Sequence, residues 1–253
     1  MFGVSALLFV LSAGVTILGC ASMSSMGGMS MPGGWTMSMA WMRMPGQTWI
    51  GAGTSFLAMW VVMMVAMMLP SLMPMLRTYR QAIGRGGEPR LGRLTTFVGA
   101  GYFFVWTVIG LVAFPLGVAL AEMEMRQPAL ARAVPTAVGL VVLIGGVLQF
   151  SAWKARHLAC CRCESVCGFT LPADVGTAWR HGVRLGIHCS YCCAGLTAIL
   201  LVVGVMDLRV MAAVMAAITA ERLAPSGQRA ARGIGVVVVA VGVVMIGRAV
   251  GVE

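Results

Sequence analysis

Hydrophobic residues occur along the chain in long, nearly uninterrupted runs, with polar and charged residues gathered between them. The runs cover residues 2–21, 55–76, 95–121, 133–153, 185–206, 210–224 and 233–250. A helix that crosses a bilayer needs about 20 predominantly apolar residues. Six runs come close to or exceed that length, whereas 210–224 extends only about 22 Å at 1.5 Å per residue. The pattern predicts an all-α fold, a polytopic membrane helix bundle of about seven transmembrane helices, or six if the short sixth segment is not a full span.

The composition agrees with a membrane location. The chain is 59% hydrophobic and 10% charged, with a mean hydropathy of +0.91, whereas soluble domains have about 25% charged residues. The first run lacks the positive leader and the Ala-x-Ala site of a signal peptide, so we expect it to be retained as a helix. We expect a single membrane domain over 1–253, made of a first span (1–22), a Met-rich outer loop (23–50), spans two to four (51–153), a Cys-rich cytoplasmic loop (154–184) and spans five to seven (185–253).

The basic residues indicate the orientation of the chain. The net charge is +10, but the Lys and Arg residues are concentrated in 77–93, 154–184 and 222–232 rather than spread over a nucleic-acid-binding face. Cytoplasmic loops of membrane proteins carry an excess of Lys and Arg. The distribution predicts a bacterial cytoplasmic (inner) membrane protein with its N-terminus inside and the Met-rich loop outside, and no nucleic-acid partner.

The strongest chemical signal is a group of ligand-type residues at the start of the run 185–206: His188, Cys189, Cys192 and Cys193. Residues three and four apart share one face of a helix, so these side chains should form one stripe. Thiolates and imidazole suit Cu(I), Zn(II) or redox chemistry, and do not suit Mg or Ca. The alternative is that each cysteine is a small buried hydrophobe. Four such residues on one face favour a metal or redox site.

Methionines supply a second signal, in the outer loop and in the span that follows it. Glycine and proline should prevent a regular helix over 23–49. Thioethers are soft ligands for Cu(I), although an interfacial loop and flexible packing are the alternatives. Pro70 and Pro74 should kink the second span. The candidate thioether ligands are Met37, Met39, Met42 and Met44 in the loop, and Met59, Met63 and Met67 at four-residue spacing in the span.

Two further places carry candidate ligands on the predicted cytoplasmic side. The spacing of Cys160, Cys163 and Cys167 is compatible with metal binding. A cytoplasmic location favours metal binding or redox chemistry over structural disulfides. Glu221 should lie near the depth of His188, and an ionisable group inside a membrane is a functional candidate with a partner. We expect Arg222 or His188 to be that partner.

Several of these motifs resemble a bacterial family of predicted metal-binding integral membrane proteins, catalogued as domain of unknown function 2182. The resemblance implies metal binding and a membrane location, and covers roughly residues 41–222. It is carried by Trp60-x-x-Met63-x-x-Ala66-Met67-Met68-Leu69-Pro70, by Gln149-x4-Lys154, by the Cys160 and Cys163-x-x-x-Cys167 region, by Cys189-x-x-Cys192-Cys193, and by Glu221 with the basic residue after it.

These observations favour a copper(I)-binding integral membrane protein that captures, moves or delivers copper. The alternatives are a subunit of a copper-dependent membrane oxidase or monooxygenase, and a membrane thiol–disulfide oxidoreductase using Cys189 and Cys192. We expect an accessory protein more than an enzyme; an enzyme would be a copper-dependent oxidoreductase. Cu(I) is the expected cofactor, ahead of zinc or haem. The expected partners are membrane lipid, the metal ion and another membrane or periplasmic subunit of a copper complex.

Overall fold

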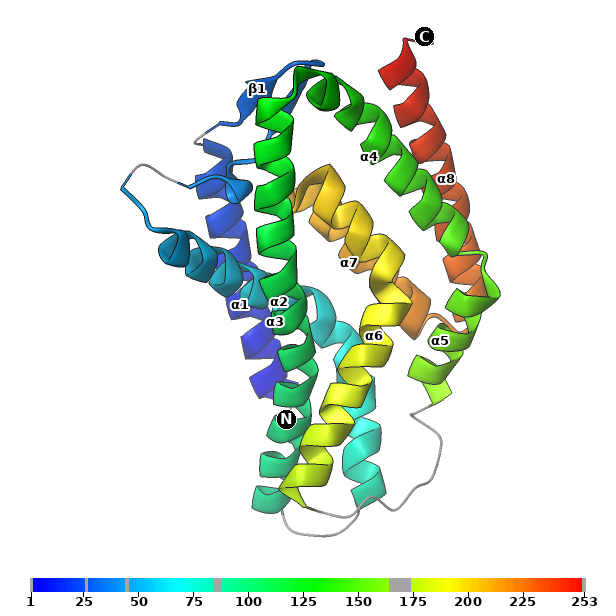
Figure 1. Ribbon diagram of the computed structural model, residues 1–253. Helices are drawn as coiled ribbons and strands as arrows, with labels where there is room; N and C mark the ends of the chain where they lie inside the picture. Colours follow the sequence, from blue (N-terminus) through cyan, green and yellow to red (C-terminus); the bar gives the residue numbers. More distant parts are fainter. Residues whose placement is uncertain (1, 26, 44–45, 84–87, 164–173, 252–253) are drawn as a thin grey trace.

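The computed structural model describes residues 2–25, 27–43, 46–83, 88–163 and 174–251, and these residues are almost entirely helical (Figure 1). The helices are α1 (Phe2–Ser25), α2 (Trp49–Ile83), α3 (Glu88–Arg126), α4 (Pro128–Leu148), α5 (Ala152–Cys163), α6 (Val175–Gly204), α7 (Leu208–Leu223) and α8 (Gly227–Val250). A small antiparallel hairpin, β1 (Met29–Met31) and β2 (Trp35–Met37), and the 3₁₀ turn η1 (Met39–Trp41) lie between α1 and α2.

Six of the described helices are long and apolar enough to cross a membrane: α1, α2, α3, α4, α6 and α8. The predicted all-α polytopic bundle is therefore confirmed. The short run 210–224 corresponds to α7, which has 16 residues and is not among the six. The alternative of six full spans therefore fits, with α7 as a shorter segment that contacts α6 and returns the chain toward α8 (Figure 1).

Two segments predicted as basic loops are largely helical. Within 77–93, α2 continues to Ile83 and α3 begins at Glu88; within 154–184, the structure has α5 and the first part of α6. Each apolar run marks the part of its helix that can lie in lipid. Backbone hydrogen bonding continues beyond that part, so the helices extend past their apolar runs.

The helix α2 carries both prolines within its length, Pro70 and Pro74. A proline inside a helix removes one backbone hydrogen bond and clashes with the preceding turn. Figure 1 shows α2 changing direction between its first and second halves. Between α1 and α2, the described residues 27–43 form the hairpin and the 3₁₀ turn instead of a regular α-helix, as expected.

Small residues allow α3 and α6 to pack closely. A Cβ atom added to Gly101 would lie 2.6 Å from the carbonyl oxygen of Trp179, and one added to Gly186 would lie 2.9 Å from the carbonyl oxygen of Tyr102. Membrane helices commonly associate through such small residues. This close approach brings the side chains of α3 against the cysteine face of α6.

Candidate functional site

Four buried cysteines come together where α5, α6 and α7 meet α3. As the spacing predicted, Cys189, Cys192 and Cys193 share a buried face of α6, and Cys161 of α5 joins them. The Cys161 thiol interacts with that of Cys192, and the Cys193 thiol interacts with those of Cys189 and Cys192. We call these four residues the thiol cluster.

Two polar side chains contact the thiol cluster directly. The Tyr102 hydroxyl lies 2.8 Å from Sγ of Cys189, within hydrogen-bonding distance. Nη2 of Arg222 lies 3.7 Å from Sγ of Cys193 and 3.9 Å from Sγ of Cys161. Arg222 is only 8% exposed, and its Nε and Nη1 have no hydrogen-bond partner among the described residues. The cluster is therefore bordered by a buried cation with unused donors.

A buried ion pair stands beside the cluster. Nζ of Lys154 lies 2.6 Å from Oε2 of Glu221 and also donates to the carbonyl oxygen of Cys192, at 2.6 Å. Both side chains are buried, with 5% of the Lys154 and 1% of the Glu221 side chain exposed. We expected Arg222 or His188 to pair with Glu221, but the structure shows Lys154 in that position, because residue 154 lies on a helix that packs back against α6 and α7.

The charges around the cluster sum to one positive charge. Lys154 and Glu221 compensate each other at 2.6 Å, so Arg222 remains as a cation facing the sulfur atoms. A buried charge is costly unless it is paired. One negative charge at the sulfur atoms would compensate the Arg222 guanidinium.

Residues 57–245 match the PpoB2 family of proteins, described as a copper chaperone. The chain belongs to this family. The matched residues run from α2 into α8 and include the whole thiol cluster, Lys154, Glu221 and Arg222. No curated protein and no solved structure matches the chain. The relation to copper predicted from the sequence is confirmed, whereas membership of the family of domain 2182 stays a prediction.

His188 lies on α6 of this PpoB2 chain, directly before Cys189. It is half-buried, and its ring centroid is 6.4 Å from that of His157 on α5. Trp153 and Tyr191 also pack against His157. The two imidazoles each lie four residues before a cysteine of the cluster, His157 before Cys161 and His188 before Cys192.

The predicted methionine ligands are distributed over three places. Met39, Met42 and Met59 line a pocket near the hairpin. Met63 and Met67 are buried in the main core together with the thiol cluster. Met37 is buried in a separate small cluster with Met31. Met44 lies outside the described residues.

One cysteine of the α5 segment, Cys161, was not among the predicted ligands. Cys167 and the side chains of Cys160 and Cys163 lie outside the described part of the structure, whereas Cys161 joins the cluster. The signal that could have found it is helical spacing: Lys154, Leu158 and Cys161 recur at four and three residues and are all buried.

The cluster is not arranged as a complete metal site. Within the part of the chain that the structure describes, no three His, Cys, Asp or Glu side chains are placed so that they could hold a metal ion. The sulfur atoms interact instead with one another, with Tyr102 and with Arg222.

Proposed function

We propose that this protein is a membrane copper(I) chaperone and that the thiol cluster holds the ion between capture and delivery. The observation that carries the proposal is the contact of the buried Arg222 guanidinium with the thiols of Cys161 and Cys193. Membership of the family supports a relation to copper. The thiol cluster and Arg222 support Cu(I) in particular, through their ligand chemistry and their charge.

The charge of the site favours a two-coordinate Cu(I) complex. Soft thiolate ligands select Cu(I) among the common metal ions, and two thiolates bound to Cu(I) carry one net negative charge. Arg222 supplies one positive charge, and the Lys154–Glu221 pair supplies none. A tetrahedral zinc site with four thiolates would instead carry two negative charges. Two sulfur ligands also suffice for Cu(I), so a site without three converging ligands remains suitable.

The other side chains of the site hold the cluster in place. Lys154 fixes the backbone at Cys192 through its hydrogen bond to that carbonyl oxygen, and Glu221 holds Lys154. Tyr102 orients the Cys189 thiol. His188 and His157 lie one turn away and would receive the ion as it leaves the sulfur atoms. Cys160, Cys163 and Cys167 continue as candidate ligands next to Cys161.

In this proposal the protein lies in the bacterial inner membrane with residues 23–50 outside, as the basic residues of 77–93 and 154–184 indicate. Cu(I) captured outside would pass the row of Met59, Met63 and Met67 and reach the thiol cluster, from which a copper protein of the membrane would receive it. Met63 and Met67 belong to the same continuous core as the cysteines, which supports this order.

The decisive experiment is copper loading of the detergent-purified protein without oxygen, followed by elemental analysis. We expect the double variant Cys161→Ser and Cys193→Ser to lose one copper equivalent relative to wild type. Cys20→Ser is the matched control, because Cys20 is also a buried cysteine but contacts Met211 rather than the cluster. Equal copper content in the double variant and the control would overturn the proposal.

A further inference from the structure

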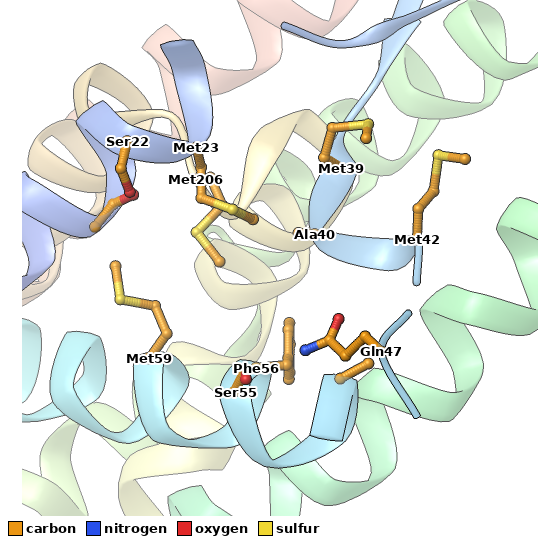
Figure 2. A pocket seen from close by; sticks show the side chains of 12 residues that line it. Ser22, Met23, Met39, Ala40, Met42, Gln47, Ser55, Phe56, Met59 and Met206 are labelled. Carbon is orange, nitrogen blue, oxygen red and sulfur yellow. The ribbon is translucent and has the colours of Figure 1, made fainter. Parts of the chain in front are cut away.

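A pocket of about 300 Å³ lies at the hairpin end of the bundle, away from the thiol cluster. Its walls come from the end of α1, the segment around η1, the start of α2 and the turn between α6 and α7 (Figure 2). Five of the residues that line it are methionines: Met23, Met39, Met42, Met59 and Met206.

We infer that this pocket is a second metal site, a thioether site for a soft monovalent cation such as Cu(I) or Ag(I). The methionines come from four separate segments of the chain, and Figure 2 shows their sulfur-bearing side chains around one space. Thioether sulfur is a soft ligand that selects Cu(I). It is neutral and carries no proton, so acid does not compete with the metal for it.

The rest of the lining supports a soft ion rather than a hard one. The polar side chains that line the pocket are Ser22, Gln47 and Ser55, and none of its described lining residues is charged. Mg²⁺ and Ca²⁺ are bound through several oxygen ligands, usually with carboxylates among them. This pocket offers mainly neutral sulfur, with Phe56 as an aromatic wall.

Packing against the core accounts for only one side of these methionines: Met23, Met59 and Met206 pack against the main core and Met42 against the smaller cluster. Methionine often fills irregular gaps in a core, and Met64 and Met68 do so, with at most 1% of their surface exposed. The five pocket methionines are all half-buried and border an open volume instead of filling it. Their sulfur atoms are therefore placed between the core and the surface, where an ion can reach them.

The family relationship does not by itself explain the pocket. The match to the PpoB2 family covers residues 57–245. Met23, Met39 and Met42 lie before that range, on α1 and in the segment around η1. The site is therefore completed by the N-terminal part of this chain.

A contact between two buried sulfur atoms lies next to the pocket, outside its lining. Cys20, next to the pocket residue Gly19, lies with Sγ 3.9 Å from Sδ of the buried Met211. Met211 is on α7, whose other end carries Arg222 beside the thiol cluster. If the proposed function holds, the pocket is the site of capture, because neutral thioethers bind Cu(I) less tightly than thiolates and would release it inward.

The test uses Ag(I), which is redox-inert, and a full-length variant with all five pocket methionines replaced by leucine. Met-to-Leu changes usually cost less than about 1.5 kcal/mol each, and these positions are half-buried. The control variant carries five Met-to-Leu changes elsewhere, at Met29, Met64, Met68, Met123 and Met125. Binding is measured by calorimetry at about pH 5, where protons compete with Ag(I) for thiols. We expect the pocket variant to bind one Ag(I) equivalent fewer than the control, or to bind it at least tenfold more weakly.

A second measurement needs no variant. In wild-type protein labelled at the methionine methyl carbons, Ag(I) should shift the NMR signals of the pocket methionines and leave those of Met64 and Met68 unchanged. Equal Ag(I) binding by the pocket and control variants, or methyl shifts confined to methionines outside the pocket, would overturn the inference. The result is independent of the thiol cluster: a Cys161→Ser, Cys193→Ser variant that keeps all its copper would refute the proposed function and leave this test unaffected.

Discussion

The buried ion pair between Lys154 and Glu221 allows a quantitative prediction of how mutations change the free energy of unfolding. Glu221→Gln removes the negative charge but keeps the shape of the side chain. It leaves the Lys154 ammonium, 5% exposed, without its carboxylate partner. We expect this single change to lower the free energy of unfolding by about 3–5 kcal/mol, the usual effect of removing one member of a buried pair.

The magnitude follows from the geometry. At the observed 2.6 Å, and with an effective dielectric constant of about 20, the attraction is roughly 6 kcal/mol. Desolvation of each ion costs several kcal/mol, so the pair as a whole contributes little net stability. Replacing both residues, as in Lys154→Met with Glu221→Leu, should therefore cost much less than the two single changes together. The remaining cost is that of the Cys192 carbonyl oxygen, which loses its donor.

The assay is a double-mutant cycle on the detergent-purified protein, with unfolding followed by circular dichroism as denaturing detergent is added to mixed micelles. The coupling energy is the cost of the double change minus the two single costs. We expect the coupling energy to be nearly as large as the cost of one single change, so that the double variant is about as stable as either single variant. Additive costs, within about 0.5 kcal/mol, would refute the view that the two charges stabilise each other.

Two further predictions concern α3 and α6. Gly182→Ala should destabilise the protein by about 1–3 kcal/mol in the same assay, because the added Cβ meets the carbonyl oxygen of Val98. The control is Gly99→Ala, which should not destabilise the protein, because a Cβ at Gly99 meets nothing within 4 Å. Equal effects of the two changes would refute the close-packing argument. Hydrogen bonds from Thr177 lower the pKa of Asp174, the N-cap of α6, below its ordinary value of 3.8. Because the pKa is lower in the folded state, this contribution to stability is complete above the unfolded pKa and is lost as the pH falls through the folded pKa. Between about pH 5 and about pH 2, the free energy of unfolding should fall less in Asp174→Ala than in wild type. An equal fall in the two proteins would contradict this role of Asp174.

The parts of the structure that depend on local pattern were predictable from the sequence. Apolar run length located the six long helices, and three- and four-residue spacing placed Cys189, Cys192 and Cys193 on one buried face. Both features follow from the geometry of a single helix. No knowledge of the neighbouring helices is needed for either.

The parts that depend on contacts between distant segments were not predictable. Lys154 looked like a loop residue in a basic stretch, and only the packing of α5 against α6 and α7 makes it the partner of Glu221. The same packing selects Cys161 for the cluster. The Met-rich segment was recognised by composition, but the contribution of Met206 to the pocket depends on the position of the α6–α7 turn.

The short helix α7 begins directly after Asp207, next to the pocket residue Met206, and ends with Glu221 and Arg222 at the cysteines. Its 16 residues correspond to about 24 Å of rise. We infer that its length is set by the separation of these two places rather than by the thickness of the bilayer. One inserted residue would rotate everything beyond it by about 100° and shift it by about 1.5 Å. Insertions and deletions in α7 should therefore be poorly tolerated, because they would displace Glu221 and Arg222 from the thiol cluster.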